Sequence, residues 1–95
     1  MRVYVSGKVT GDDDAGEKFN RADQRLRELG MEVLDPVLVN SFLPSSLSYG
    51  ERMRCCMTYL ELCDAIYLLS DWKDSPGARA EKAYAEAIGK IVIYA

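Results

Sequence analysis

Apolar and polar positions along the chain follow two periods, in an order typical of a parallel α/β sheet. Short, nearly continuous apolar runs predict four strands, at residues 2–6, 31–35, 64–70 and 90–95. Between them, apolar residues recur every three or four positions and predict three helices, at residues 15–29, 51–63 and 75–89. Strands that alternate with helices indicate βαβ units. The pattern therefore predicts a single α/β domain over residues 1–95.

Residues typical of helix ends support these boundaries. Asp14 and Glu17 have the spacing of a capping box, and Gly30 follows the last apolar position of the first predicted helix. Ser75 precedes Pro76, which suits an N-cap followed by proline at the first helical position. The first and last helices are therefore expected to begin near residues 15 and 76.

The order of the elements limits the topology. Right-handed crossovers favour a small doubly wound sheet of the flavodoxin or Rossmann type, with four or five parallel strands in the order 2-1-3-4 and helices on both faces. Ligands bind such sheets at the carboxyl ends of the strands, where the order reverses. The expected crevice is therefore bordered by residues 6–11 and 70–77. Residues 36–50 have no clear period, and loops of this length more often form functional lids than idle linkers.

Composition and charge narrow the choice of partners. The 95 residues, 48% of them apolar, suffice for one small domain. The net charge of -3 gives no basic surface for duplex DNA or RNA. Because the chain opens without an apolar leader and has no apolar run near ~20 residues, we expect a cytoplasmic protein without membrane contact. Cys55, Cys56 and Cys63, with no histidine, fit neither a disulfide framework nor a zinc site, so no metal or cofactor is expected.

One carboxylate departs from the amphipathic pattern of the last predicted helix. At about 100° per residue, Arg79, Lys82 and Glu86 form a charged stripe, whereas Glu81 lies on the apolar side. A buried carboxylate must be paired, hydrogen-bonded or neutralised. Glu81 is therefore either a boundary residue that reaches water or a basic partner, or a group that lines the crevice. In the second case, the helix N-terminus around Gly77 would offer N–H groups to an anionic ligand.

Several segments of the chain resemble a known family. MRVYVSGKVTG, RELGMEVLDP, CDAIYLLSDWKDSPGARAE and AIGKIVIYA are similar to the DUF4406 family, which is related to nucleoside 2-deoxyribosyltransferases and 2'-deoxynucleoside 5'-phosphate N-hydrolases. The resemblance implies cleavage of the bond between a nucleobase and deoxyribose, or deoxyribosyl transfer, with Glu81 as nucleophile. As in a retaining glycosidase, a carboxylate attacks the anomeric carbon through an oxocarbenium-like transition state, and water or another base resolves the ester.

The same resemblance implies roles for residues near the ends of the first and third predicted strands. Tyr4 matches a tyrosine that orients the glutamate by a hydrogen bond in the transferases, although a strand tyrosine can also simply pack. Ser75 matches a serine that binds the 5'-phosphate in the monophosphate hydrolases, which favours a nucleotide ligand over a nucleoside. Lys8 replaces the usual proline and either adds a phosphate contact or lies in solvent. The turn expected to contact sugar and base comprises Ser6, Gly7, Lys8 and Val9.

One position departs from the family pattern in a way that bears on catalysis. Cys56 stands where the family usually has an aspartate that orients or protonates the base, and a neutral thiol is a poor general acid. Either a neighbouring carboxylate such as Asp71, expected to contact substrate, replaces it, or the protein binds a nucleotide without cleaving it rapidly. Trp72 and Tyr49 are candidates for stacking on a base, although packing is the favoured role of Trp72. Asp64 is expected at the entry of a strand, away from the crevice.

The sequence thus supports one leading function and three alternatives. The leading hypothesis is N-glycosidic bond cleavage or deoxyribosyl transfer on a nucleoside 5'-monophosphate. The main alternative is a non-catalytic nucleotide-binding or sensing module on the same fold, and the weaker ones are cleavage of another N-ribosyl compound such as NAD and a purely structural interaction domain. The expected partner is a small-molecule nucleoside or nucleotide. Because related proteins form dimers, a homodimer or higher homo-oligomer is also expected, through apolar residues of the second predicted helix: Met53, Met57, Leu60 and Leu62.

Overall fold

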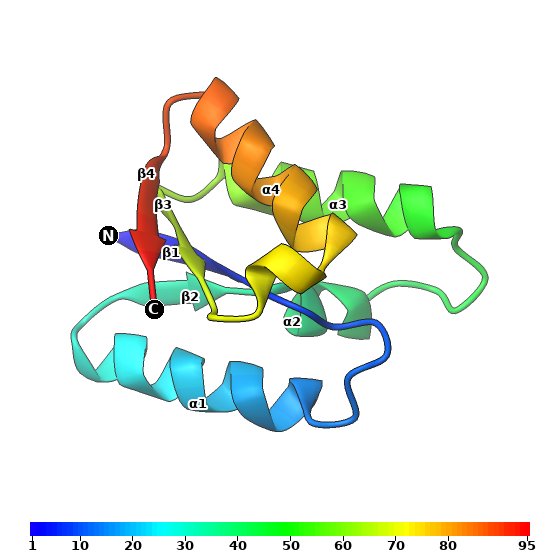
Figure 1. The fold of residues 1–95 in the computed structure, drawn as a ribbon, viewed down its shortest axis with the longest axis horizontal. Coiled ribbons are helices and arrows are strands. Elements are labelled where there is room, and N and C mark those ends of the chain that lie inside the picture. The colour runs from blue at the N-terminus through cyan, green and yellow to red at the C-terminus, as the bar shows by residue number, and fades with distance from the viewer.

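The structure of the protein, a computed structural model that describes all residues 1–95, contains a four-stranded parallel sheet (Figure 1). Its strands are β1 (Arg2–Ser6), β2 (Glu32–Leu34), β3 (Ala65–Leu68) and β4 (Ile91–Tyr94). They lie in the order β2-β1-β3-β4, and every neighbouring pair is parallel. The predicted order 2-1-3-4 is therefore confirmed, with four strands rather than five.

Helices cover both faces of this sheet, as the sequence predicts (Figure 1). α1 (Ala15–Glu28) lies on one face, and α3 (Tyr49–Glu61) and α4 (Pro76–Ala87) lie on the other. Two short helices complete the fold: α2 (Pro36–Ser41) follows β2, and the 3-10 helix η1 (Trp72–Asp74) follows β3. Because both follow strands directly, they lie at the carboxyl edge of the sheet, where the topology predicts a ligand.

Alternate residues of β1 divide the core between the two faces of the sheet. Val3 and Val5 pack in the cluster that includes α1, whereas Tyr4 packs in the cluster that includes α3 and α4. All three side chains are fully buried. Leu60 of α3 is also fully buried while Leu62 is exposed, so the apolar helix surface expected to support dimerisation belongs partly to the core.

The predicted long loop over residues 36–50 is shorter than expected, because it begins with a helix. The Asp35 carboxylate accepts a hydrogen bond from the Leu38 N–H at 2.8 Å and caps α2, and Pro36 occupies its first turn. The strand before it does end at Leu34, but the prediction of an irregular segment from residue 36 onward is wrong, because a helix of six residues is too short to show an apolar period.

The predicted capping box at Asp14 and Glu17 is also wrong. Asp14 precedes α1 but its side chain makes no capping hydrogen bond. A capping box lies instead at the start of α3, where Ser48 Oγ accepts from the Glu51 N–H and the Glu51 carboxylate accepts from the Ser48 N–H. Gly30, with φ of 86°, ends the α1 region as predicted.

Candidate functional site

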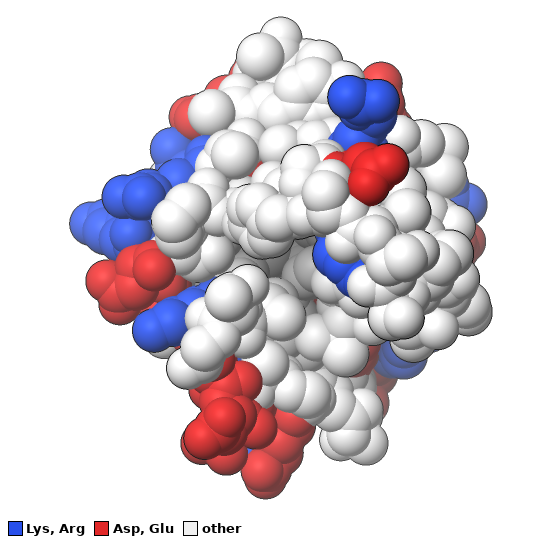
Figure 2. Space-filling view, turned by 90° about the vertical axis from the view of Figure 1, so that its right-hand side faces the viewer, with Lys and Arg blue, Asp and Glu red and all other residues white.

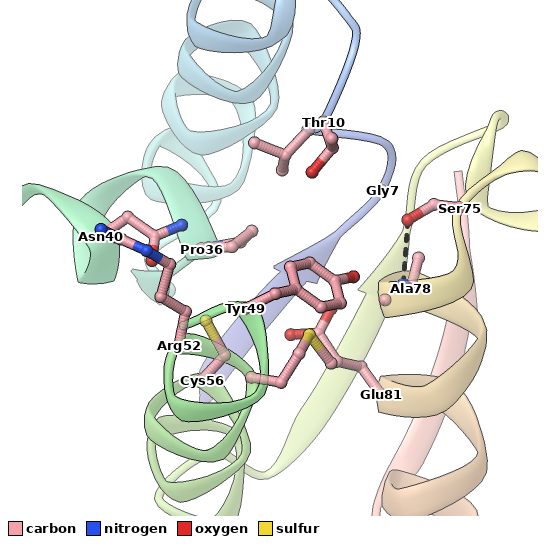
Figure 3. Close-up of a pocket in the computed structure, with 13 residues that line it drawn as sticks. Gly7, Thr10, Pro36, Asn40, Tyr49, Arg52, Cys56, Ser75, Ala78 and Glu81 are labelled. Atoms are coloured by element: carbon pink, nitrogen blue, oxygen red, sulfur yellow. Dashed lines mark hydrogen bonds between the residues drawn. The ribbon is translucent and has the colours of Figure 1, made fainter. Parts of the chain in front are cut away.

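A cavity of about 100 Å³ lies at the carboxyl end of β1, between α2, α3 and the N-terminus of α4 (Figure 3). The face of the molecule shown in Figure 2 is hollowed near its centre, and the residues around the hollow are mostly uncharged. This is the edge of the sheet at which the topology predicts ligand binding. Thirteen residues line the cavity: Gly7, Val9, Thr10, Pro36, Asn40, Tyr49, Arg52, Met53, Cys56, Ser75, Gly77, Ala78 and Glu81.

Glu81, on the second turn of α4, holds its carboxylate at the inner wall of this cavity. Its side chain is almost completely buried, with 3% of the residue exposed. The Tyr4 hydroxyl donates to Oε2 at 2.6 Å, and the Ser6 hydroxyl donates to Oε1 at 2.7 Å. Both donors come from β1, two residues apart and therefore on the same face of the sheet. Each carboxylate oxygen is thus fixed by one hydroxyl group. Glu81 therefore needs no contact with water or with a basic side chain, which were the partners expected for a boundary residue.

The surroundings of Glu81 control its ionisation. Burial raises the pKa of Glu81 to about 7, and the hydrogen bonds from Tyr4 and Ser6 oppose part of that increase. Burial also raises the pKa of Tyr4 well above its usual value, and the negative charge of Glu81 adds to this effect. Tyr4 therefore remains a hydrogen-bond donor at any physiological pH. The result is a buried carboxylate that changes charge near neutrality while its geometry is held by two neutral groups.

Ser75 and the N-terminus of α4 form one end of the cavity. Ser75 Oγ accepts from the Ala78 N–H at 3.0 Å, so Ser75 is the N-cap that the sequence predicts. The N–H of Gly77 lies in the first turn, where no intrahelical acceptor exists. A Cβ at Gly77 would lie 2.8 Å from the Tyr49 hydroxyl, which explains why glycine suits this position. This end offers backbone N–H groups and the positive end of a helix dipole.

The structure places two of the predicted binding residues away from the cavity. The Asp71 carboxylate accepts from the backbone N–H of Lys8 at 3.1 Å and pairs with the Lys18 ammonium at 2.6 Å. Neither Lys8 nor Asp71 lines the cavity, and Asp71 therefore provides no carboxylate beside Cys56. Gly7 and Val9 do line it, whereas Ser6 lies behind Glu81 and contacts the cavity only through that residue.

Cys56 lines the cavity on the side of α3. Burial raises the pKa of its thiol to about 11, so the thiol is neutral at physiological pH. Glu81 is the only acidic residue among the thirteen that line the cavity. The base-side aspartate that the family resemblance leads one to expect therefore has no substitute here.

Several lining residues are absent from the site residues predicted from the sequence. Asn40 lies on α2, in the segment predicted to be a loop, and Thr10 lies in the segment 6–11, which was expected to border the crevice without a role for Thr10 itself. Arg52 is one helical turn before Cys56, and this i,i+4 spacing is the signal that would have placed it on the same face of α3. Tyr49, a stacking candidate, lies beside Glu81 in Figure 3.

Two other aromatic and acidic candidates lie outside the cavity. Trp72 packs against Tyr94, with ring centroids 6.2 Å apart, and Lys82 lies 5.2 Å from its ring, so packing is its observed role. Asp64 accepts from the Arg2 backbone N–H at 2.8 Å, at the entry of β3 as expected. No group of three or more cysteine and acidic side chains is arranged to hold a metal ion.

Comparison with known proteins agrees with the observed topology. The model of the family described as a domain of unknown function, DUF4406, matches residues 1–94. No curated protein matches the chain. Separately, none of the helices has the length and apolar character needed to cross a membrane.

Two solved structures share the fold at low sequence identity. A 2-desoxiribosyltransferase from Leishmania mexicana aligns over 99% of this chain and 63% of its own, with a TM-score of 0.75 and 19% identity. The CMP N-glycosidase BcmB from Clostridium botulinum aligns over 99% of this chain and 70% of its own, with a TM-score of 0.70 and 20% identity. The chain thus spans less than two thirds of the first of these proteins. On the family match, the chain belongs to the DUF4406 family, and it shares its fold with these two solved structures.

Proposed function

We propose that the protein cleaves the N-glycosidic bond of a deoxynucleoside 5'-monophosphate, or transfers its deoxyribosyl group to another base, with Glu81 as the nucleophile. The observation that carries this proposal is the buried Glu81 carboxylate in the cavity wall, held by Tyr4 and Ser6 and poised to ionise near pH 7. Structural neighbours named as a 2-desoxiribosyltransferase and a CMP N-glycosidase support the same class of reaction.

The reaction follows from the chemistry of one carboxylate. Ionised Glu81 attacks the anomeric carbon of the sugar, the bond to the base breaks, and its electron pair leaves with the base, which takes up a proton from water. Positive charge develops on the sugar in the transition state and is stabilised by the nearby carboxylate. Water then attacks the glycosyl ester and releases the sugar phosphate, or a second base attacks and completes a transfer.

The ends of the cavity suggest how the substrate is oriented. In this proposal the 5'-phosphate binds at the N-terminus of α4, where Ser75 and the N–H of Gly77 lie. Gly7 and Val9 contact the sugar above Glu81. Tyr4 and Ser6 are positioning residues, since they fix the two carboxylate oxygens without reaching the substrate.

The neutral Cys56 thiol favours a second candidate function. Without an acidic group other than Glu81 in the cavity, no side chain is available to protonate a departing base. A non-catalytic nucleotide-binding or sensing module on the same fold would need Glu81 only to contact the sugar hydroxyl groups. The two candidates differ in turnover and agree on the ligand.

A panel of deoxynucleoside monophosphates tests both candidates. Incubation followed by chromatography measures free base, and thermal shift measures binding under the same conditions. Base release that disappears in Glu81→Gln supports the enzyme. Stabilisation by a nucleotide without release of its base supports the binding module. If Cys56→Asp then releases base while the unmodified protein does not, the thiol limits turnover. If no nucleotide releases its base and none stabilises the protein, both candidate functions are contradicted.

The oligomeric state remains part of the proposal. Apolar residues are exposed near the ends of α3 and α4 and along the edge strand β4, namely Leu62, Ile88, Ile91 and Tyr94. An edge strand with exposed apolar side chains is a suitable surface for association. We therefore keep the expectation of a homodimer, which sedimentation at micromolar concentration checks.

A further inference from the structure

Asn40, a residue of the cavity wall, carries an unusual polar atom. Its side-chain Oδ1 is shielded from solvent and has no hydrogen-bond partner in the protein, although Asn40 lines the cavity. A buried acceptor without a donor is unfavourable, and most such atoms in folded proteins find a partner. The missing partner is therefore expected from a ligand that carries an N–H or O–H group.

Arg52 supplies the opposite hydrogen-bonding character at the same end of the cavity. One of its guanidinium nitrogens donates to the Pro44 carbonyl at 3.0 Å. The guanidinium carries five N–H donors and no acceptor, so donors remain for a ligand. In Figure 3, Asn40 and Arg52 lie together on the side of the cavity opposite Ser75. This end of the cavity therefore combines one free acceptor with several donors.

We propose that Asn40 and Arg52 recognise the base, and that they select a base with an exocyclic amino group, as in cytosine and adenine. This inference rests on the proposed function, which places the phosphate at Ser75 and the anomeric carbon at Glu81. The base then extends toward α2 and α3. Asn40 Oδ1 accepts from the exocyclic amino group, and Arg52 donates to the neighbouring ring nitrogen.

The same geometry disfavours thymine and uracil. In these bases a carbonyl oxygen replaces the amino group of cytosine. This oxygen would face Asn40 Oδ1, and two acceptors form no hydrogen bond with each other. A site built around a hydrogen bond discriminates strongly against analogues that cannot form it, because its own polar group is then left unpaired.

Binding measurements in the Glu81→Gln protein, where turnover does not interfere, test the inference. Isothermal titration compares dCMP with the deoxynucleotide of 2-pyrimidinone, which lacks only the amino group, and compares dAMP with the deoxynucleotide of unsubstituted purine. We expect at least one amino base to bind about tenfold or more tightly than its analogue and than dTMP. Asn40→Leu should remove that difference, whereas Asn20→Leu, at an exposed position of α1, should retain it.

Arg52 requires its own comparison, because an arginine also binds phosphate. Arg52→Met should weaken the binding of dCMP and of deoxycytidine by the same factor, while Arg54→Met, at an exposed position of the same helix, should leave both unchanged. A loss confined to dCMP would assign Arg52 to the phosphate and overturn its role at the base. This variant also serves as a second test if Asn40→Leu fails to fold.

The inference and the proposed function fail in different ways. Equal binding of dCMP, dAMP, dTMP and the two analogues would overturn base selection by Asn40 and leave the proposed function intact. Absence of binding by every nucleotide, together with no base release by the unmodified protein, would overturn both.

Discussion

Replacing Glu81 by glutamine should stabilise the protein at alkaline pH and leave its stability nearly unchanged in mild acid. The pKa of Glu81 is raised from 4.5 to about 7 in the folded protein, chiefly by burial. The folded state therefore binds more protons than the unfolded state between these values, and stability is lost as the pH rises from about 4.5 to about 7. The shift corresponds to about 3 kcal/mol at full ionisation. Glutamine resembles the protonated form of Glu81, since it has a similar shape, one acceptor oxygen, one donor group and no charge.

Urea unfolding of both proteins at pH 4.5, 7 and 8.5 measures this effect. The free energy of unfolding of Glu81→Gln relative to the unmodified protein should increase by about 3 kcal/mol between the two extremes, and most of this increase should be complete by pH 7. Asp23, whose pKa burial and the neighbouring Asp35 raise to about 8, titrates in both proteins and cancels in the difference. Glu86→Gln, which removes an exposed carboxylate from the same helix, is the control and should change little with pH. If the difference in the free energy of unfolding between Glu81→Gln and the unmodified protein does not vary with pH, Glu81 is not a buried carboxylate that ionises in this range.

Other predictions follow from the same contacts. The kcat/KM for base release should rise with pH and level off above about 7, because only ionised Glu81 attacks the sugar. Tyr4→Phe removes a hydrogen bond that lowers the pKa of Glu81, so the midpoint of this profile should move upward and release at pH 7 should fall about tenfold. Gly7→Ala places a methyl group 2.9 Å from Leu69 Cδ1 and 3.0 Å from its Cβ, and should lower the free energy of unfolding by about 1–3 kcal/mol. Gly16→Ala, in an open part of α1, should instead raise it by up to about 1 kcal/mol, and thermal unfolding compares the two.

The sheet could be predicted because its determinants are local and redundant. Each strand is a short apolar run, each crossover contains a helix, and right-handed connections leave few arrangements of four strands. Glu81 could be identified because one charged residue on the apolar side of a helix is visible in the spacing alone. Its hydrogen-bond partners on β1 could be identified only from the structure, since Tyr4 is 77 residues away in the sequence.

Two differences between the sequence-based predictions and the structure have specific physical causes. A capping box needs an extended residue at the N-cap, and Ser48 has φ of -69° and ψ of 163°, whereas Asp14 has φ of -95° and ψ of 8°. Sequence spacing is the same at both positions and does not report this geometry. Asp71 was assigned to substrate because the turn after β3 borders the crevice, but Lys18 of α1 reaches it across the sheet edge and forms an ion pair. Such a partner cannot be inferred from local sequence.

The most direct test of the central claim is the rate of base release from deoxynucleoside monophosphates at pH 8 by three proteins: the unmodified chain, Glu81→Gln and Glu86→Gln. If Glu81 is the nucleophile, the unmodified protein and Glu86→Gln release base at similar rates, and Glu81→Gln is slower by about a thousandfold or more. Equal rates in the unmodified protein and Glu81→Gln would contradict the claim, as would the absence of release from every deoxynucleotide.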